Sequence, residues 1–159
     1  MTVYFFDTSA IQYRYLPGPK ARSIRRICSD GRNVCHIAEL TILEIASALG
    51  KRYRGQTITL REHRRAERAF WEDIRSGRLC VRPTQKKDIL RARHLMAYAG
   101  VDLRRNITSV DALIAATAVE CALETNARVA LCLEDRGLYN AIKDIPVYRS
   151  ALRFRYIGK

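Results

Sequence analysis

Four acidic side chains occupy positions where an α/β chain can bring carboxylates together. Asp7 and Asp135 each directly follow a short apolar run with the character of a buried strand. Glu44 and Asp111 each fall in the first turn of a segment whose apolar residues recur with helical spacing. Because ligands of an open parallel sheet bind outside the carboxyl ends of its strands, we expect these four carboxylates to point into one crevice.

Such a crevice would favour a divalent cation. Clustered carboxylates repel one another, and some would stay protonated unless a cation lies among them. Mg²⁺ prefers oxygen ligands, keeps several waters and binds through one or two carboxylates together with substrate phosphate. Ions held in this way activate water and stabilise the leaving oxygen in phosphodiester cleavage. The hydroxyls of Thr8 and Ser9 are expected to hydrogen-bond the metal-binding carboxylates.

Each acid also has an interpretation that involves no chemistry. Asp7 suits the N-cap of a following helix, and Glu44 has the spacing to complete a capping box with Thr41. Asp111 suits the positive end of a helix dipole, and Asp135 suits the start of a turn. Taken singly, these interpretations are preferable, but the shared location of all four acids favours a site. Capping and metal binding are also compatible in one side chain.

The chain carries a large excess of arginine. Its 159 residues include 23 Arg and 6 Lys against 16 acidic residues, which gives a formal net charge of +13. The planar guanidinium group matches phosphate oxygens in pairs. The charge therefore indicates a polyanionic partner, either a nucleic acid or an acidic protein, rather than solubility alone.

The sequence disfavours several other classes of protein. Its five cysteines include no C-x-x-C pair, so we expect neither a zinc site nor a disulfide framework, and a reducing cytoplasm is the predicted location. The N-terminal residues do not resemble a signal peptide, and no segment is long enough to span a bilayer. Ser9 has no evident histidine partner, which argues against a hydrolase triad.

Strand-like and helix-like segments alternate along the whole chain. This alternation predicts an α/β fold with a parallel sheet covered by helices on both faces, in a single domain over residues 1–159. Helices 41–54 and 60–76 are candidates for an arm that projects from the sheet. Strands are expected at 3–6, 34–37, 79–82, 128–133 and 145–148, and helices at 8–16, 21–29, 41–54, 60–76, 84–99, 109–124 and 138–143.

Taken together, four motifs resemble the PIN-domain family, and their order is similar to that of the VapC-type toxins of prokaryotic toxin–antitoxin pairs. The resemblance covers nearly the whole chain, and the helix DALIAATA after the third acid makes it specific. The motifs are DTSA at 7–10, LTILE at 40–44, DALIAATA at 111–118 and EDRGL at 134–138.

The resemblance implies a three-layer α/β/α sandwich and Mg²⁺- or Mn²⁺-dependent endoribonuclease activity on RNA such as tRNA or rRNA. It implies an antitoxin partner that obstructs the site, and commonly a homodimer. Asp7, Glu44, Asp111 and Asp135 match the acidic positions of the family one by one, as catalytic and metal-binding residues.

One position departs from the family pattern. Two residues before the last acid the family often has a hydroxyl, whereas this chain has Leu133, which puts the support of Asp135 in doubt. Glu134 is a candidate for a partial substitute. Two alternatives therefore stay open: a PIN nuclease of RNA maturation or decay without an antitoxin, and a binding module without turnover.

Overall fold

A parallel sheet lies at the centre of the protein. The computed structural model describes residues 1–102 and 107–157, and within them five strands pair in the order β3–β2–β1–β4–β5, all parallel. The strands are β1 (Thr2–Phe6), β2 (Asn33–Ala38), β3 (Cys80–Arg82), β4 (Val129–Leu133) and β5 (Leu152–Tyr156).

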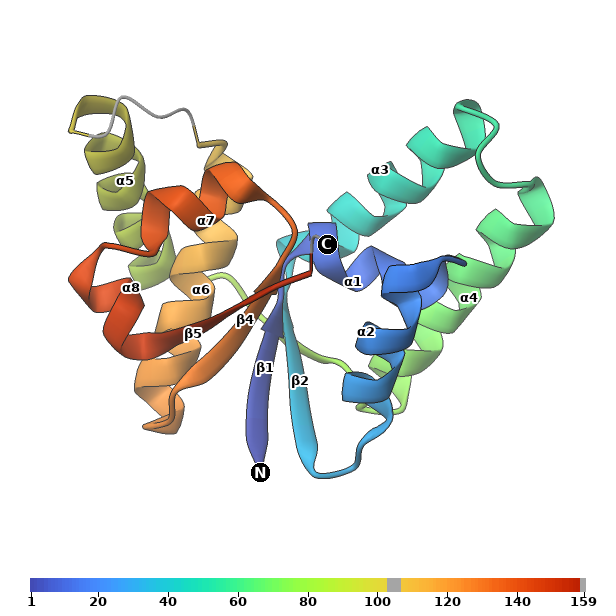
Figure 1. The fold of residues 1–159 in the computed structure, drawn as a ribbon, viewed down its shortest axis with the longest axis horizontal. Coiled ribbons are helices and arrows are strands. Elements are labelled where there is room, and N and C mark those ends of the chain that lie inside the picture. The colour runs from blue at the N-terminus through green and yellow to red at the C-terminus, as the bar shows by residue number, and fades with distance from the viewer. Residues whose placement is uncertain (103–106, 158–159) are drawn as a thin grey trace.

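Helices cover both faces of this sheet, which confirms the predicted three-layer α/β/α sandwich (Figure 1). One face carries α1 (Thr8–Tyr15), α2 (Pro19–Ser29), α3 (Leu40–Arg54) and α4 (Leu60–Arg75). The other carries α5 (Lys86–Val101), α6 (Ser109–Thr125), α7 (Arg136–Ile142) and α8 (Pro146–Ala151). None of the described helices is long and apolar enough to cross a membrane.

The side-chain alternation of the central strands divides the core into two clusters. In β1, Val3 and Phe5 pack with α6, whereas Phe6 packs with α1 and α2 on the other face. Every residue of β4 is buried, as a strand covered on both sides requires. The strand ends are therefore fixed firmly from both faces, and the residues that follow β1 and β4 are positioned at one edge of the sheet.

The helices α3 and α4 form a hairpin that extends away from the sheet, as the sequence suggested (Figure 1). A buried carboxylate connects this hairpin to the rest of the domain. Asp73 of α4 forms ion pairs with Arg14 and Arg78, and Tyr15 donates a hydrogen bond of 2.9 Å to it. The ring of Phe70 meets Tyr15 edge to face at 5.5 Å between centroids. These contacts hold α4 against the end of α1, the helix that carries Thr8 and Ser9.

Two local predictions were wrong. Residues 145–148 do not form a strand, because Pro146 occupies the first turn of α8, where its missing N–H costs nothing. The fifth strand is β5 instead, where Leu152 and Phe154 join the core and the intervening Arg153 is exposed.

The predicted capping box of Thr41 and Glu44 was also wrong, whereas Thr59 and Glu62 form a capping box at the start of α4. Helix α3 begins one residue earlier, so Thr41 is buried inside its first turn, and no side chain caps the helix. Glu44 is consequently free for another contact.

Candidate acidic active site

The four acids that the sequence singled out line one pocket. Its volume is about 290 Å³, and Asp7, Glu44, Asp111 and Asp135 all contribute to its wall. The other lining residues are Thr8, Ser9, Gln12, Ser47, Ala48 and Lys51. Four separate elements bring the acids together: the end of β1, the second turn of α3, the first turn of α6 and the N-cap of α7.

Asp7 is held at the junction of β1 and α1. Its backbone N–H donates to the carbonyl of Cys132 at 3.0 Å, which extends the β1–β4 pairing to the strand ends. Its carboxylate caps α1 by accepting from the N–H of Ser9 at 3.2 Å and also accepts from the Ser9 hydroxyl. That hydroxyl accepts in turn from the N–H of Glu134 at 2.9 Å. Ser9 thus ties the ends of β1 and β4 together around Asp7.

Glu44 reaches across from α3 toward α1. The Thr8 hydroxyl donates to its carboxylate. Because Glu44 takes no part in capping its own helix, its position is explained by this contact and by the pocket it lines.

Asp111 and Asp135 combine local hydrogen bonds with their place in the pocket wall. Asp111 accepts from the hydroxyl of Thr108 at 2.6 Å, and Thr108 caps α6. Asp135 is the N-cap of α7 and accepts from the N–H of Leu138 at 2.8 Å. For Asp7 and Asp135 the capping and pocket-lining interpretations hold at the same time, and Asp111 lines the pocket from the first turn of α6, at the positive end of the helix dipole.

Burial and mutual repulsion oppose ionisation of the pocket acids. Only 2% of Asp7 is exposed. Burial, opposed by the Ser9 hydrogen bond and reinforced by the charges of Asp111 and Glu44, raises the pKa of Asp7 to about 6 from its ordinary 3.8. Burial likewise raises the pKa of Glu44 and of Asp111 above their usual ranges. A cation in the pocket would relieve both the desolvation and the repulsion.

Comparison with known proteins decides the family. The family model of the PIN domain matches residues 4–141, which include all four acids. The chain belongs to the PIN-domain family. The comparison with curated proteins found no match.

Solved structures similar to this PIN domain include three VapBC proteins. DNA-bound VapBC from Salmonella typhimurium is 16% identical, with 99% of each chain covered and a TM-score of 0.64. VapBC-5 from Mycobacterium tuberculosis, a member of a family of toxin–antitoxin systems, is 12% identical, with 98% of this chain and 99% of that chain covered and a TM-score of 0.63. VapBC-1 from nontypeable Haemophilus influenzae is 18% identical, with 99% and 100% covered and a TM-score of 0.61. At sequence identities this low, the similarity to these structures shows a shared fold.

The donors of this PIN-domain pocket fit a hard divalent cation. The acids offer carboxylate oxygens, which Mg²⁺ and Mn²⁺ prefer. Among the residues that the structure describes, no three His, Cys, Asp or Glu side chains are already arranged to hold a metal. An ion here would therefore bind through one or two carboxylates and its own waters, the mode typical of Mg²⁺.

Sequence reasoning missed three polar residues of the pocket. Ser47 follows Glu44 by three residues and Lys51 follows it by seven, which places all three on one face of α3. Gln12 follows Thr8 by four residues on α1 in the same way. The helical spacing from each predicted residue was the signal that would have found them.

The structure shows where Leu133 and Glu134 lie relative to the acidic pocket. This side chain is fully buried in the core beside α6. Glu134 forms an ion pair with Lys20, so its carboxylate is engaged outside the acidic pocket. At this strand end the hydroxyl belongs to Ser9, which donates to the Asp7 carboxylate and accepts from the N–H of Glu134.

Proposed function

We propose that this PIN domain is a divalent-metal-dependent endoribonuclease and the toxin of a VapBC-like toxin–antitoxin pair. The observation that carries the proposal is the meeting of Asp7, Glu44, Asp111 and Asp135 in one pocket, with Asp7 buried although nothing cationic pairs with it among the described residues. The whole-length likeness to VapBC structures supports the toxin assignment.

In this proposal the protein supplies binding and positioning. Asp7, Glu44 and Asp111 would hold Mg²⁺ or Mn²⁺, one or two of them directly and the rest through the waters of the ion, and Asp135 would complete the acidic wall. The bound ion supplies activation of water and neutralisation of charge at the scissile phosphate.

The remaining polar residues of the pocket orient these groups. Thr8 and Ser9 donate hydrogen bonds to Glu44 and Asp7, so their carboxylates are held in fixed orientations. Lys51 is an exposed cation at the pocket wall and is placed to bind a substrate phosphate.

Incubation of the purified protein with total RNA, with and without Mg²⁺, tests the catalytic assignment. We expect new RNA ends only with the metal, and mapping of those ends identifies the target, tRNA or rRNA. Asp7→Asn should lower the cleavage rate by more than about 100-fold, since loss of a group that only supports a metal ligand already costs 10–100-fold. Asp144→Asn, an exposed acid outside the pocket, is the matched control and should cleave normally. Equal cleavage by both variants would exclude the proposed site.

The antitoxin assignment has a separate test. A small reading frame next to this gene should encode a protein that co-purifies with the chain and blocks cleavage at equimolar amounts. Sedimentation of the free 18.2 kDa chain tests the proposed homodimer, and fractionation tests its cytoplasmic location. Cleavage without any inhibitory neighbour would instead favour an RNA maturation or decay enzyme.

A further inference from the structure

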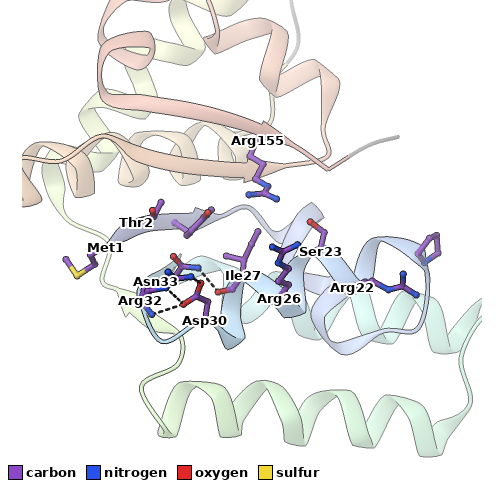
Figure 2. A pocket seen from close by; sticks show the side chains of 12 residues that line it. Met1, Thr2, Arg22, Ser23, Arg26, Ile27, Asp30, Arg32, Asn33 and Arg155 are labelled. Atoms are coloured by element: carbon purple, nitrogen blue, oxygen red, sulfur yellow. Dashed lines mark hydrogen bonds and ion pairs between the residues drawn. The ribbon is translucent and has the colours of Figure 1, made fainter.

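A second, basic hollow lies between helix α2 and the edge strand β5. Its volume is about 780 Å³, and the acidic pocket shares none of its lining residues. Arg22 and Arg26 face it from α2, and Arg155 extends toward it from β5 on the opposite wall (Figure 2). We call this hollow, with its three arginines, the arginine groove.

The three arginines lack a direct polar partner among the described residues, although the charge of Arg26 acts on Asp30, which lines the groove together with Arg32. Their neighbour Arg32 pairs with Asp30 at 3.0 and 2.8 Å. Arg22, Arg26 and Arg155, in contrast, make no hydrogen bond or ion pair with any described residue.

The local arrangement of these arginines is also unfavourable by itself. Arg22 and Arg26 are four residues apart on one helix, where like charges destabilise it. An anion in the groove would remove this repulsion.

The strand alternation explains why the groove is open. Phe154 of β5 packs into the core beside α6, so Arg155 points to the opposite face of the sheet. On that face α2 packs against α1 and β2, and the hollow remains between α2 and β5. Its floor includes Tyr4, a half-buried ring at the middle of β1. Cationic walls over an aromatic floor suit phosphates and a stacked base.

A short chain of contacts joins the arginine groove to the acidic pocket. Pro19 lines the groove, and its neighbour Lys20 pairs with Glu134. The backbone N–H of Glu134 donates to the hydroxyl of Ser9 at 2.9 Å, and Ser9 lines the acidic pocket. The Pro19 end of the groove is therefore linked to the acidic pocket through Lys20, Glu134 and Ser9.

We propose that the arginine groove binds the phosphodiester backbone of a single RNA strand whose scissile bond lies in the acidic pocket. The proposal rests on the ribonuclease function proposed above. RNA is favoured over an acidic peptide because one end of the groove is linked through Lys20 and Glu134 to the pocket where a phosphodiester would be cut, and a substrate strand must extend beyond that pocket. Phosphate contacts of this kind give affinity without reading sequence.

The test is binding of a labelled single-stranded RNA oligonucleotide in EDTA, followed by fluorescence anisotropy at several salt concentrations. Each phosphate contact on a single strand contributes about −0.7 to the slope of log K against log salt. The variant Arg22→Gln/Arg26→Gln/Arg155→Gln should therefore flatten the slope by about 2 and weaken binding about 50-fold at 0.15 M salt.

The matched control is Lys86→Gln/Arg93→Gln/Arg149→Gln, which removes the same charge from α5 and α8 on the opposite face of the sheet. These side chains lie beyond the reach of screened charges in the groove, so affinity should change less than about threefold. Circular dichroism checks folding, and the single variant Arg155→Gln should still flatten the slope by about 0.7 if the triple variant is unstable.

Several results would overturn the groove assignment. These are unchanged RNA binding by the groove variant, equal losses in the groove and control variants, or no RNA binding by the wild type. If the groove variant keeps RNA binding but loses binding of an oligoglutamate peptide, the groove serves an acidic protein instead. Because binding is measured without metal, the result is independent of whether the wild type cleaves RNA.

Discussion

The raised pKa of Asp7 predicts that replacing this acid increases the stability of the metal-free protein, although the replacement should abolish most of the cleavage activity. Asp7→Asn keeps the shape of the side chain and an oxygen that accepts from Ser9, but it cannot ionise. A tenfold change in proton affinity is worth about 1.4 kcal/mol, so the rise of the Asp7 pKa from 3.8 to about 6 corresponds to about 3 kcal/mol. In metal-free protein the variant should be more stable than the wild type at neutral pH by up to this amount.

The sign of the effect fixes its pH dependence. Below about pH 3.8 Asp7 is protonated in both the folded and the unfolded chain, so the two proteins should have similar stability. As the pH rises from 3.8 to about 6, the unfolded wild type releases its proton before the folded one does, and the wild type loses stability. Above about pH 6 the full difference should persist.

Urea or thermal unfolding in EDTA from pH 3.5 to 8 measures this difference. About 3 kcal/mol in a chain of this length corresponds to roughly 6–12 °C in Tm. Mg²⁺ should stabilise the wild type and shrink the advantage of Asp7→Asn, because only the wild type keeps the full carboxylate set. A stability difference that is the same at every pH, or a variant less stable at pH 7.5, would refute the reasoning from burial and repulsion.

Three further perturbations test other parts of the structure. Asp73→Ala should lower the free energy of unfolding by about 3–5 kcal/mol in chemical denaturation, because it leaves Arg14 without its buried anion; a loss below about 1 kcal/mol would contradict this. Burial opposes ionisation of Asp73, but hydrogen bonds from Arg14 and Arg78 outweigh it and hold its pKa below the usual range, so this stabilisation should be lost as the pH falls below about 3.9. Asn126 ends α6 with a φ of 47°, so Asn126→Val should cost about 1–2 kcal/mol in thermal unfolding, whereas Asn126→Gly should cost nothing. Lys51→Met should raise KM for RNA more than it lowers kcat, and the opposite pattern would assign Lys51 to the chemical step.

Hydrophobic spacing and capping residues are local properties, so the sequence alone was enough to predict most elements. It predicted the strands around Val3, Cys35 and Val129, the parallel sheet and the helices on both faces. It was misleading where two local interpretations competed. Residues 145–148 are apolar enough for a strand, but Pro146 suits the first turn of a helix better.

The sequence also determined which acids follow strands or begin helices, and so nominated Asp7, Glu44, Asp111 and Asp135. Only the tertiary structure decided that they share one pocket and that Asp7 is buried within it.

It also decided that two distant segments, α2 with Arg22 and Arg26 and β5 with Arg155, face one groove. The physical reason is that desolvation and Coulomb energy depend on distances in space. Those distances are set by strand register and by the angle at which helices pack, neither of which residue spacing along the chain contains.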